Sequence, residues 1–214
     1  IFSASGAFAA LLEDGSVVAW GDEMNGGQIP EIIQTQLCKN VKTIFSSYGA
    51  FAALLKDGSV VTWGFQNYGG QIPEAIQSQL CKNVKFIFSN RVAFVALLND
   101  GSVVAWGRES DGGQIPHDVQ IKLKNVKTIF SSSYAFAALL HNGSVFAWGI
   151  ETHGGKIPDA IQTQLHQNVN MVFSNDEAFA ALLKDGSVRA WGRESFGGKI
   201  YEPIQTQLIN VKVI

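Results

Sequence analysis

The sequence predicts a mainly-β protein, a five-bladed β-propeller whose units of about 43 residues each hold three antiparallel strands and a short helical segment. Three observations predict this fold. A Trp-Gly pair recurs at gaps of 43, 43, 42 and 43 residues, inside a longer segment that is nearly the same each time. One strand of each unit is apolar on both faces, so neighbouring sheets must cover it. Both chain ends align with the same point of the unit, which suits a ring of whole repeats.

The second unit illustrates the expected strands. Residues 41–46 (Val-Lys-Thr-Ile-Phe-Ser) are rich in β-forming residues and predict a first strand, and residues 51–55 and 60–63 predict the second and third. Between the last two, Asp57-Gly58 predicts a two-residue type I′ hairpin turn, because glycine supplies φ > 0 at low cost. Equivalent turns are expected at Asp14-Gly15, Asp100-Gly101, Asn142-Gly143 and Asp185-Gly186.

The fourth part of the unit, residues 72–80, predicts two short helical turns in place of an outermost strand. Pro73 suits the first helical position and Glu74 the positive helix N-terminus, while Ile76 and Leu80 form one apolar stripe. An extended outer strand is the competing interpretation of this segment.

We expect a single domain over residues 1–214, with units at approximately 1–43, 44–86, 87–128, 129–171 and 172–214. Ile1 and Ile214 both align with Ile44. The first strand of the closing unit would therefore begin in residues 210–214 and continue in Phe2 and Ser3. Such a ring would leave no unpaired outer repeat.

Composition narrows the function classes. Hydrophobic residues make up 46% of the chain and charged residues 16%, below the roughly 25% that is usual. No apolar run approaches the ~18 residues of a membrane span, and neither an initiator Met nor a charged-then-apolar leader is present. Lys and Arg are scattered and the net charge is −2, so neither a nucleic-acid nor a membrane partner is expected. Cys38 and Cys81 fall at equivalent positions too distant for a disulfide, so both are expected to be free thiols, which favours a cytoplasmic location.

The repeated unit has an alanine-leucine strand, Asp-Gly, Val-Val-Ala-Trp-Gly and then Gly-Gly, and this order resembles the RCC1 (regulator of chromosome condensation) repeat over the whole chain. The resemblance implies a β-propeller. The units are shorter than RCC1 units, and five are present where well-known members have seven. No repeat carries a long insertion and no basic tail is present, so neither nucleotide exchange on a small GTPase nor chromatin binding is carried over by the resemblance.

The loops of one predicted face differ most between units. These are the loops between strands one and two and the loops after each Trp-Gly pair. Aromatic and arginine side chains are common interface anchors, and loops on a rigid scaffold often bind partners, so we expect this face to bind a protein. The candidate residues are Met24, Tyr48, Phe65, Tyr68, Arg91, Arg108, Glu109, Tyr134, His153, Arg193 and Phe196. Unconstrained drift of exposed loops is the alternative explanation.

No catalytic, cofactor or metal constellation emerges, and the chain is not expected to be an enzyme. His117, His141, His153 and His166 occupy four different positions in the unit, and the Gly-Gly pairs lack phosphate-loop spacing. The five tryptophans, Trp20, Trp63, Trp106, Trp148 and Trp191, are expected to pack between blades rather than to line a ligand cage.

The leading hypothesis is therefore a scaffold that binds a protein. The alternatives are a regulator directed at a small GTPase, by analogy with RCC1, and a multivalent carbohydrate-binding propeller, which the dissimilar loops disfavour.

Overall fold

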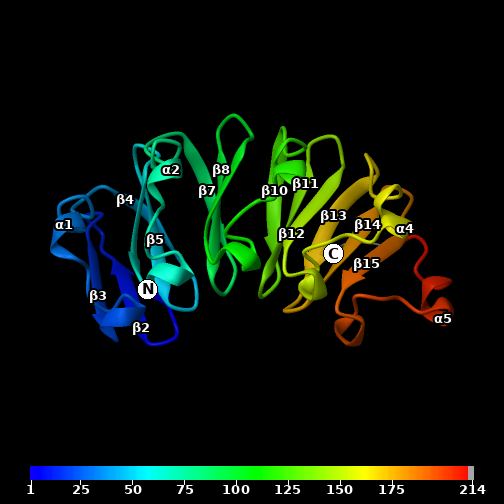
Figure 1. Ribbon diagram of the computed structural model, residues 1–214, viewed down its shortest axis with the longest axis horizontal. Helices are drawn as coiled ribbons and strands as arrows, with labels where there is room; N and C mark the ends of the chain where they lie inside the picture. Colours follow the sequence, from blue (N-terminus) through cyan, green and yellow to red (C-terminus); the bar gives the residue numbers. More distant parts are fainter. Residues whose placement is uncertain (212–214) are drawn as a thin grey trace. The chain divides into compact units, whose positions relative to one another are not determined.

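The computed structural model describes residues 1–211 and shows five three-stranded antiparallel sheets, each with its strands hydrogen-bonded in sequence order (Figure 1). The strands are β1 (Phe2–Ser3), β2 (Ala7–Leu11), β3 (Val17–Gly21), β4 (Val41–Ser46), β5 (Ala50–Leu55), β6 (Val60–Gly64), β7 (Val84–Ser89), β8 (Ala93–Leu98), β9 (Val103–Gly107), β10 (Val126–Ser131), β11 (Ala135–Leu140), β12 (Val145–Gly149), β13 (Val169–Ser174), β14 (Ala178–Leu183) and β15 (Val188–Gly192). The predicted bounds of the three strands are confirmed to within one residue at each end in the second unit.

Two short helical elements follow each sheet. The 3-10 helices are η1 (Glu23–Asn25), η2 (Gln66–Tyr68), η3 (Glu109–Asp111), η4 (Glu151–His153) and η5 (Glu194–Phe196). The α-helical turns are α1 (Glu31–Gln34), α2 (Glu74–Gln77), α3 (His117–Gln120), α4 (Asp159–Gln162) and α5 (Glu202–Gln205). Each sheet with its helical elements is called a blade here, numbered one to five along the chain.

The chain divides into two compact units. The first, Ile1–Gln114, contains blades one and two and the sheet and η3 of blade three, and the second, from Ile115 onward, contains α3 and blades four and five. The single domain over residues 1–214 and its repeat boundaries stay a prediction. The closing strand predicted at residues 210–214 falls mostly on residues 212–214, which lie outside the described residues. Phe2 and Ser3 do form a strand, in which Phe2 pairs with Ala9 and Ser3 pairs with Phe8.

Within each unit, hydrophobic cores lie between consecutive blades, as the two-sided apolar strands predict. Every residue of β5 is buried. One of its faces, with Phe51 and Ala53, packs with Ala7 and Ala9 of blade one, and the other, with Ala52 and Leu54, packs with Phe94 of blade three. In the second unit, one core likewise combines residues of β11 and β12 with Phe179 and Trp191 of blade five.

The tryptophans form the most regular contact between blades. The Trp63 indole Nε1 donates a hydrogen bond to the Gly26 carbonyl of blade one at 3.0 Å, and the Phe51 ring stacks on Trp63 with centroids 5.2 Å apart. Trp106 and Trp191 make the same bond to Gly69 and Gly154. These three side chains are at most 1% exposed and lie between blades, whereas Trp20 is 45% exposed.

Gly26 is required at this contact for two reasons. Its φ of 90° lies in the left-handed region, and a Cβ added there would stand 2.7 Å from the Phe51 ring. Only glycine meets both conditions.

The predicted type I′ turn is wrong. The loop has three residues: the Gly58 amide donates to the Leu55 carbonyl at 3.1 Å, and Gly58 alone, not Asp57, has a positive φ. This is a β-turn followed by a left-handed glycine, the second commonest hairpin connection. Asp57 contributes through its carboxylate, which accepts hydrogen bonds from the Ser59 amide at 2.9 Å and hydroxyl at 2.6 Å.

Residues 72–80 form a helical turn and not an outer strand, so the helical interpretation is confirmed, with two corrections. One α-helical turn forms rather than two, and Pro73 is its N-cap, with ψ 141°, rather than its first helical residue. Proline there still costs no hydrogen bond, because the amide of that position has no partner within a helix. No helix among the described residues is long and apolar enough to cross a membrane.

Acid should destabilise the hairpin turns in a defined pH range. Hydrogen bonds from Ser16, Ser59, Ser102 and Ser187, side chain first and backbone amide second, lower the pKa of Asp14, Asp57, Asp100 and Asp185. A lowered folded-state pKa gives stability that is complete above the unfolded value of about 4 and is lost as pH falls through the folded value.

Replacing all four aspartates with Asn should therefore flatten the dependence of unfolding free energy on pH below about 4. The wild type already accepts the backbone bond with an amide oxygen at Asn142, 2.9 Å from the Ser144 amide, so the fold should persist. Urea titrations from pH 2 to 7 would test this, and an unchanged acid slope would contradict it.

A second stability prediction concerns the turn that leads into the next sheet. Within residues 1–211, five non-glycine residues have a positive φ: Asn83 and Asn125 immediately before β7 and β10, Lys39 and Gln167 two residues before β4 and β13, and Asn210. Asn tolerates this region better than other side chains. Gln167→Asn should raise the unfolding free energy by about 0.5–1 kcal/mol, and the reverse control Asn83→Gln should lower it by a similar amount. Equilibrium urea unfolding measures both, and shifts of equal sign would contradict the assignment.

Candidate functional site

The variable loops meet at one end of each sheet. In blade two, Tyr48 lies between β4 and β5, and Tyr68 ends η2 after β6. The Phe65 amide donates to the Gly49 carbonyl at 2.8 Å, so the two loops are joined by a backbone hydrogen bond. The loop pairs predicted to share a face are therefore in contact within a blade.

A side chain just after the first strand fixes η2, η3, η4 and η5. The Ser47 hydroxyl donates to the Tyr68 carbonyl at 2.8 Å, and the Asn90 amide donates to the Asp111 carbonyl at 2.7 Å. Ser132 bonds to the His153 carbonyl and Asn175 to the Phe196 carbonyl, each at 2.8 Å. Donor and acceptor are 21 residues apart in every case. We call this bond the loop latch; its recurring Ser or Asn was visible in the sequence but was not recognised there.

Five of the predicted residues form one continuous cluster in the first unit. Tyr68 contacts Tyr48 at 6.2 Å and Phe65 at 4.8 Å between ring centroids, both edge to face. The Arg91 guanidinium lies 5.8 Å from the Tyr48 ring, and that of Arg108 lies 5.5 Å from the Tyr68 ring. Blades two and three both contribute. We call these residues the aromatic–arginine cluster.

This cluster is exposed to solvent, and a buried carboxylate holds one of its arginines in place. Tyr48 is 49% exposed, and the Arg108 side chain is 47% exposed. Arg108 Nε lies 3.7 Å from the carboxylate of Asp111, a buried residue that also accepts a hydrogen bond from the Ser110 hydroxyl at 2.7 Å. Asp111 was not among the predicted site residues. Its carboxylate holds the Arg108 guanidinium at the surface next to three aromatic rings.

The second unit brings four loop residues together around a carboxylate. Glu177 pairs with Arg193 at 2.5 Å and with His153 Nε2 at 3.9 Å. His153 meets the Tyr134 ring edge to face at 5.0 Å, and the Arg193 guanidinium lies 5.2 Å from the Phe196 ring. Glu177 was not among the predicted site residues. Its charge is balanced within the cluster by Arg193.

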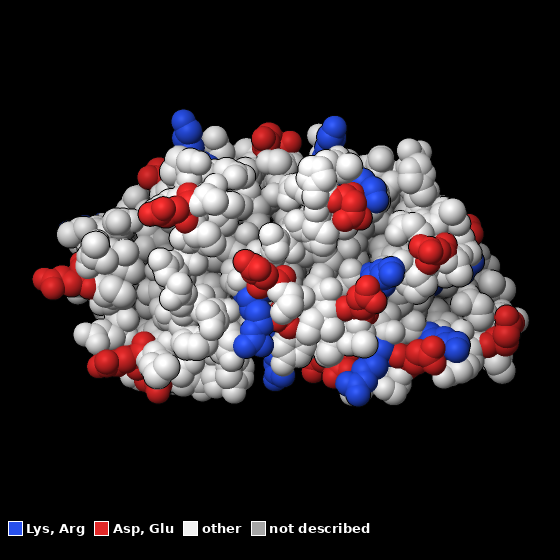
Figure 2. Space-filling model, viewed as in Figure 1, with Lys and Arg blue, Asp and Glu red and all other residues white. Residues whose placement is uncertain are grey.

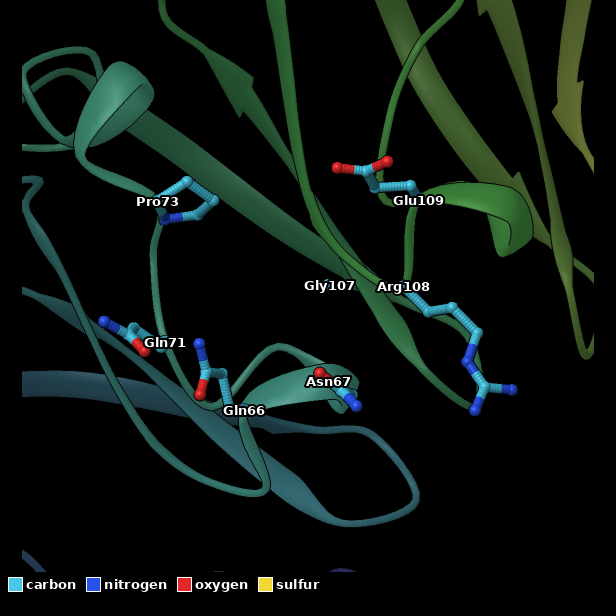
Figure 3. A pocket seen from close by; sticks show the side chains of 7 residues that line it. All are labelled: Gln66, Asn67, Gln71, Pro73, Gly107, Arg108 and Glu109. Atoms are coloured by element: carbon cyan, nitrogen blue, oxygen red, sulfur yellow. The ribbon is translucent and has the colours of Figure 1, made fainter.

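Met24 and Glu109 lie outside both clusters. Met24 is 67% exposed on η1. Glu109 lines a hollow of about 420 Å³ with Gln66, Asn67, Gln71 and Pro73, and Arg108 of the cluster also lines it. Figure 3 shows its carboxylate and the Arg108 guanidinium pointing in opposite directions from adjacent positions. The hollow carries amide groups and no buried charge, so it offers polar contacts without a reactive group.

The described residues contain no group of three or more His, Cys, Asp or Glu that could hold a metal ion. The lowered pKa values of Asp14, Asp57, Asp100 and Asp185 are explained by the serine hydrogen bonds in the hairpin turns. Cys38 and Cys81 are exposed free thiols, as predicted. On the face seen in Figure 2, acidic and basic side chains are interspersed rather than gathered into a single block.

No family model matches the sequence, and no curated protein matches it. Solved structures do match. Prp20p from Saccharomyces cerevisiae, the yeast RCC1, is 18% identical, with a TM-score of 0.57 over 94% of this chain and 58% of its own. The fold is that of the RCC1-like β-propellers. The predicted resemblance is thereby confirmed at the level of fold.

Two further solved structures match with similar scores. The ectodomain of the Physcomitrella patens receptor kinase CR4 is 17% identical, with a TM-score of 0.55 over 88% of this chain and 50% of its own. Human WBSCR16 is 16% identical, with a TM-score of 0.54 over 93% and 63%. The chain thus spans between half and two thirds of the length of these three structures.

The loop latch can be tested with two asparagines that make the same three hydrogen bonds. Asn90 Oδ1 accepts from the Val92 and Ala93 amides, and Asn175 Oδ1 accepts from the Glu177 and Ala178 amides. Asn90 is buried and Asn175 is exposed. Asn90→Ala should cost about 2–3 kcal/mol of unfolding free energy, because it strands buried donors, and Asn175→Ala about 1 kcal/mol. Equal losses in urea unfolding would contradict this account.

Proposed function

We propose that this chain is a non-catalytic scaffold that binds a protein partner through the aromatic–arginine cluster of its first unit. The observation that carries the proposal is the contact network of Tyr48, Phe65, Tyr68, Arg91 and Arg108, which joins loops of two blades into one exposed surface.

The chemistry of this surface suits protein recognition. Tyr and Arg are enriched among residues that dominate binding energy, and a ring held by edge-to-face contacts loses little conformational freedom on binding. The loop latch from Ser47 fixes the backbone at Tyr68 before any partner arrives. Drift alone gives no reason for the variable residues to contact one another across blades, so the network favours binding over drift.

The partner surface should offer acidic side chains next to apolar ones. Two guanidiniums lie beside the aromatic rings of the cluster, and the carboxylate nearest to Arg108 belongs to a buried residue. Carboxylates of a partner can therefore pair with the arginines while its apolar side chains cover the rings.

A small GTPase is the second candidate, and one comparison favours it: Prp20p was studied for its binding to Gsp1p and histones. In this chain a GTPase would be bound rather than activated, because no repeat carries the long insertion expected of an exchange factor. Nucleotide-release assays on a GTPase panel separate the two: accelerated release would identify an exchange factor, and binding without release would identify the GTPase as a scaffold partner.

The cluster itself is tested by replacing Phe65, Tyr68 and Arg108 together with Ala. Partners captured from lysate by the wild type and quantified by mass spectrometry should lose at least about tenfold in recovery, as expected when anchor residues are truncated. The matched control replaces Glu13, Lys56 and Asn99, exposed residues of the hairpin loops of blades one, two and three.

The control variant should capture the same proteins as the wild type. A cluster variant that remains folded by circular dichroism and captures an unchanged set would contradict the proposed site. Any protein lost should then bind the purified wild type directly in calorimetry.

A further inference from the structure

A carboxylate of blade three lacks the lysine that its equivalents have in blades four and five. Glu151 pairs with Lys156, five residues further along, at 3.7 Å, and the equivalent pair of blade five measures 3.4 Å. In blade three the same two positions hold Glu109 and Gln114. Among residues 1–211, Glu109 forms no ion pair and its carboxylate accepts no hydrogen bond. Blade three therefore presents a negative charge that the chain does not balance at this position.

This carboxylate faces the hollow of about 420 Å³ between blades two and three. The blade-two side of the hollow carries a proline ring and three carboxamide side chains, those of Pro73, Gln66, Asn67 and Gln71. Figure 3 shows the Glu109 carboxylate on the side where Pro73 and the two glutamines lie. The guanidinium of the adjacent Arg108 points the other way. The charge that faces the hollow is therefore negative.

The carboxamides that line the hollow also have free hydrogen-bonding capacity. Gln66, Asn67 and Gln71 are exposed, and in the part of the chain that the structure describes none of their side chains makes a hydrogen bond. Each carboxamide oxygen has two lone pairs with which it can accept. The hollow thus combines one carboxylate with three neutral acceptors.

The backbone on both sides of the hollow is held in place. In blade two the Gly70 amide donates to the Phe65 carbonyl at 3.0 Å, and in blade three the Gly113 amide donates to the Arg108 carbonyl at 2.9 Å. The loop latch also ties η2 to the end of β4. A ligand therefore meets a backbone that is already ordered, which lowers the entropic cost of binding.

We propose that this hollow binds the guanidinium of an arginine side chain on the protein partner. The inference rests on the proposed function, because the hollow adjoins the aromatic–arginine cluster through Arg108, which belongs to both. A guanidinium has five N–H donors and no acceptor. It can give two of them to the Glu109 carboxylate in a bidentate pair and the others to the carboxamide oxygens.

The site fixes the orientation of the partner. Arg108 and Glu109 are adjacent in the sequence and point in opposite directions. Carboxylates of the partner therefore belong over the cluster, and its arginine belongs in the hollow on the other side. A partner with these charges exchanged meets like charges at both places, which disfavours it.

The probe for the site is Nα-acetyl-arginine amide, titrated into isotopically labelled protein and followed by NMR. The side-chain amide signals of Gln66, Asn67 and Gln71 should shift together with the backbone signal of Glu109. Nα-acetyl-citrulline amide has nearly the same shape without the positive charge, so it should leave these signals in place. Added salt should weaken the binding of the arginine probe, because the pair is exposed.

Two substitutions of exposed residues should remove the site and keep the fold. Glu109→Gln removes the charge, and Gln114→Lys supplies the lysine that blades four and five carry at this position. Each should weaken probe binding about fivefold, which is what an exposed ion pair of good geometry contributes. The control is Glu23→Gln, which removes the equivalent carboxylate of blade one, outside the hollow, and should leave the affinity unchanged.

A probe that shifts none of these signals would overturn the site. So would a probe that binds the Glu109→Gln variant as tightly as the wild type, or a citrulline probe that binds as tightly as the arginine probe.

A purified partner separates this inference from the proposed function. A protein whose capture depends on the aromatic–arginine cluster should lose about fivefold in affinity for the Glu109→Gln and Gln114→Lys variants. Unchanged affinity of that protein would overturn the arginine site and leave the cluster as the binding surface. If the cluster variant loses no protein while the probe still binds through Glu109, the proposed function is overturned, and with it a protein partner as the source of the guanidinium.

Discussion

The contact of a Phe-Trp pair on a left-handed glycine is the interaction on which the rest of the structure depends. It joins blade one to two, two to three and four to five with the same hydrogen bond and nearly the same ring geometry. A single repeat whose middle strand is apolar on both faces cannot bury both of them by itself. Blade two therefore owes its stability to blades one and three, which cover its two faces, and the glycine makes the close approach possible.

A repeated contact of this kind leaves the loops at one end of the sheets free to vary. Gly69 closes η2, bonds to Trp106 and ends the loop that carries Phe65 and Tyr68. The residues between Gly64 and Gly69 can change without loss of packing, because both glycines and the loop latch hold the backbone. This explains how near-identical blades present an aromatic surface with two arginines in one unit and a Glu177-centred ion-pair cluster in the other.

The repeat period and the two-sided apolar strands were sufficient to predict the blades, because both follow directly from local residue patterns. The turn type was not predictable from Asp57-Gly58 alone, since the same pair serves two-residue and three-residue loops and the choice depends on how Leu55 pairs with Ser59. Variation among the loops singled out most of the residues of both clusters. Their partners Asp111 and Glu177 were missed. Asp111 is three residues from Arg108, but only the fold shows that it is buried below the arginine. Glu177 is 16 residues from Arg193, and only the fold brings the two together.

Trp20 shows where equal sequence stops implying equal environment. Phe8 stacks on Trp20 with ring centroids 5.4 Å apart, much as Phe51 stacks on Trp63 at 5.2 Å, yet Trp20 is 45% exposed and Trp63 is 1% exposed. The pairing of the two rings is therefore set within the blade, by residues that the sequence repeats. Burial is set by the blade that packs against the pair, because the Gly26 carbonyl that accepts the Trp63 hydrogen bond belongs to blade one. A repeated sequence can thus predict the ring pair at every unit, but it cannot predict the burial of each pair.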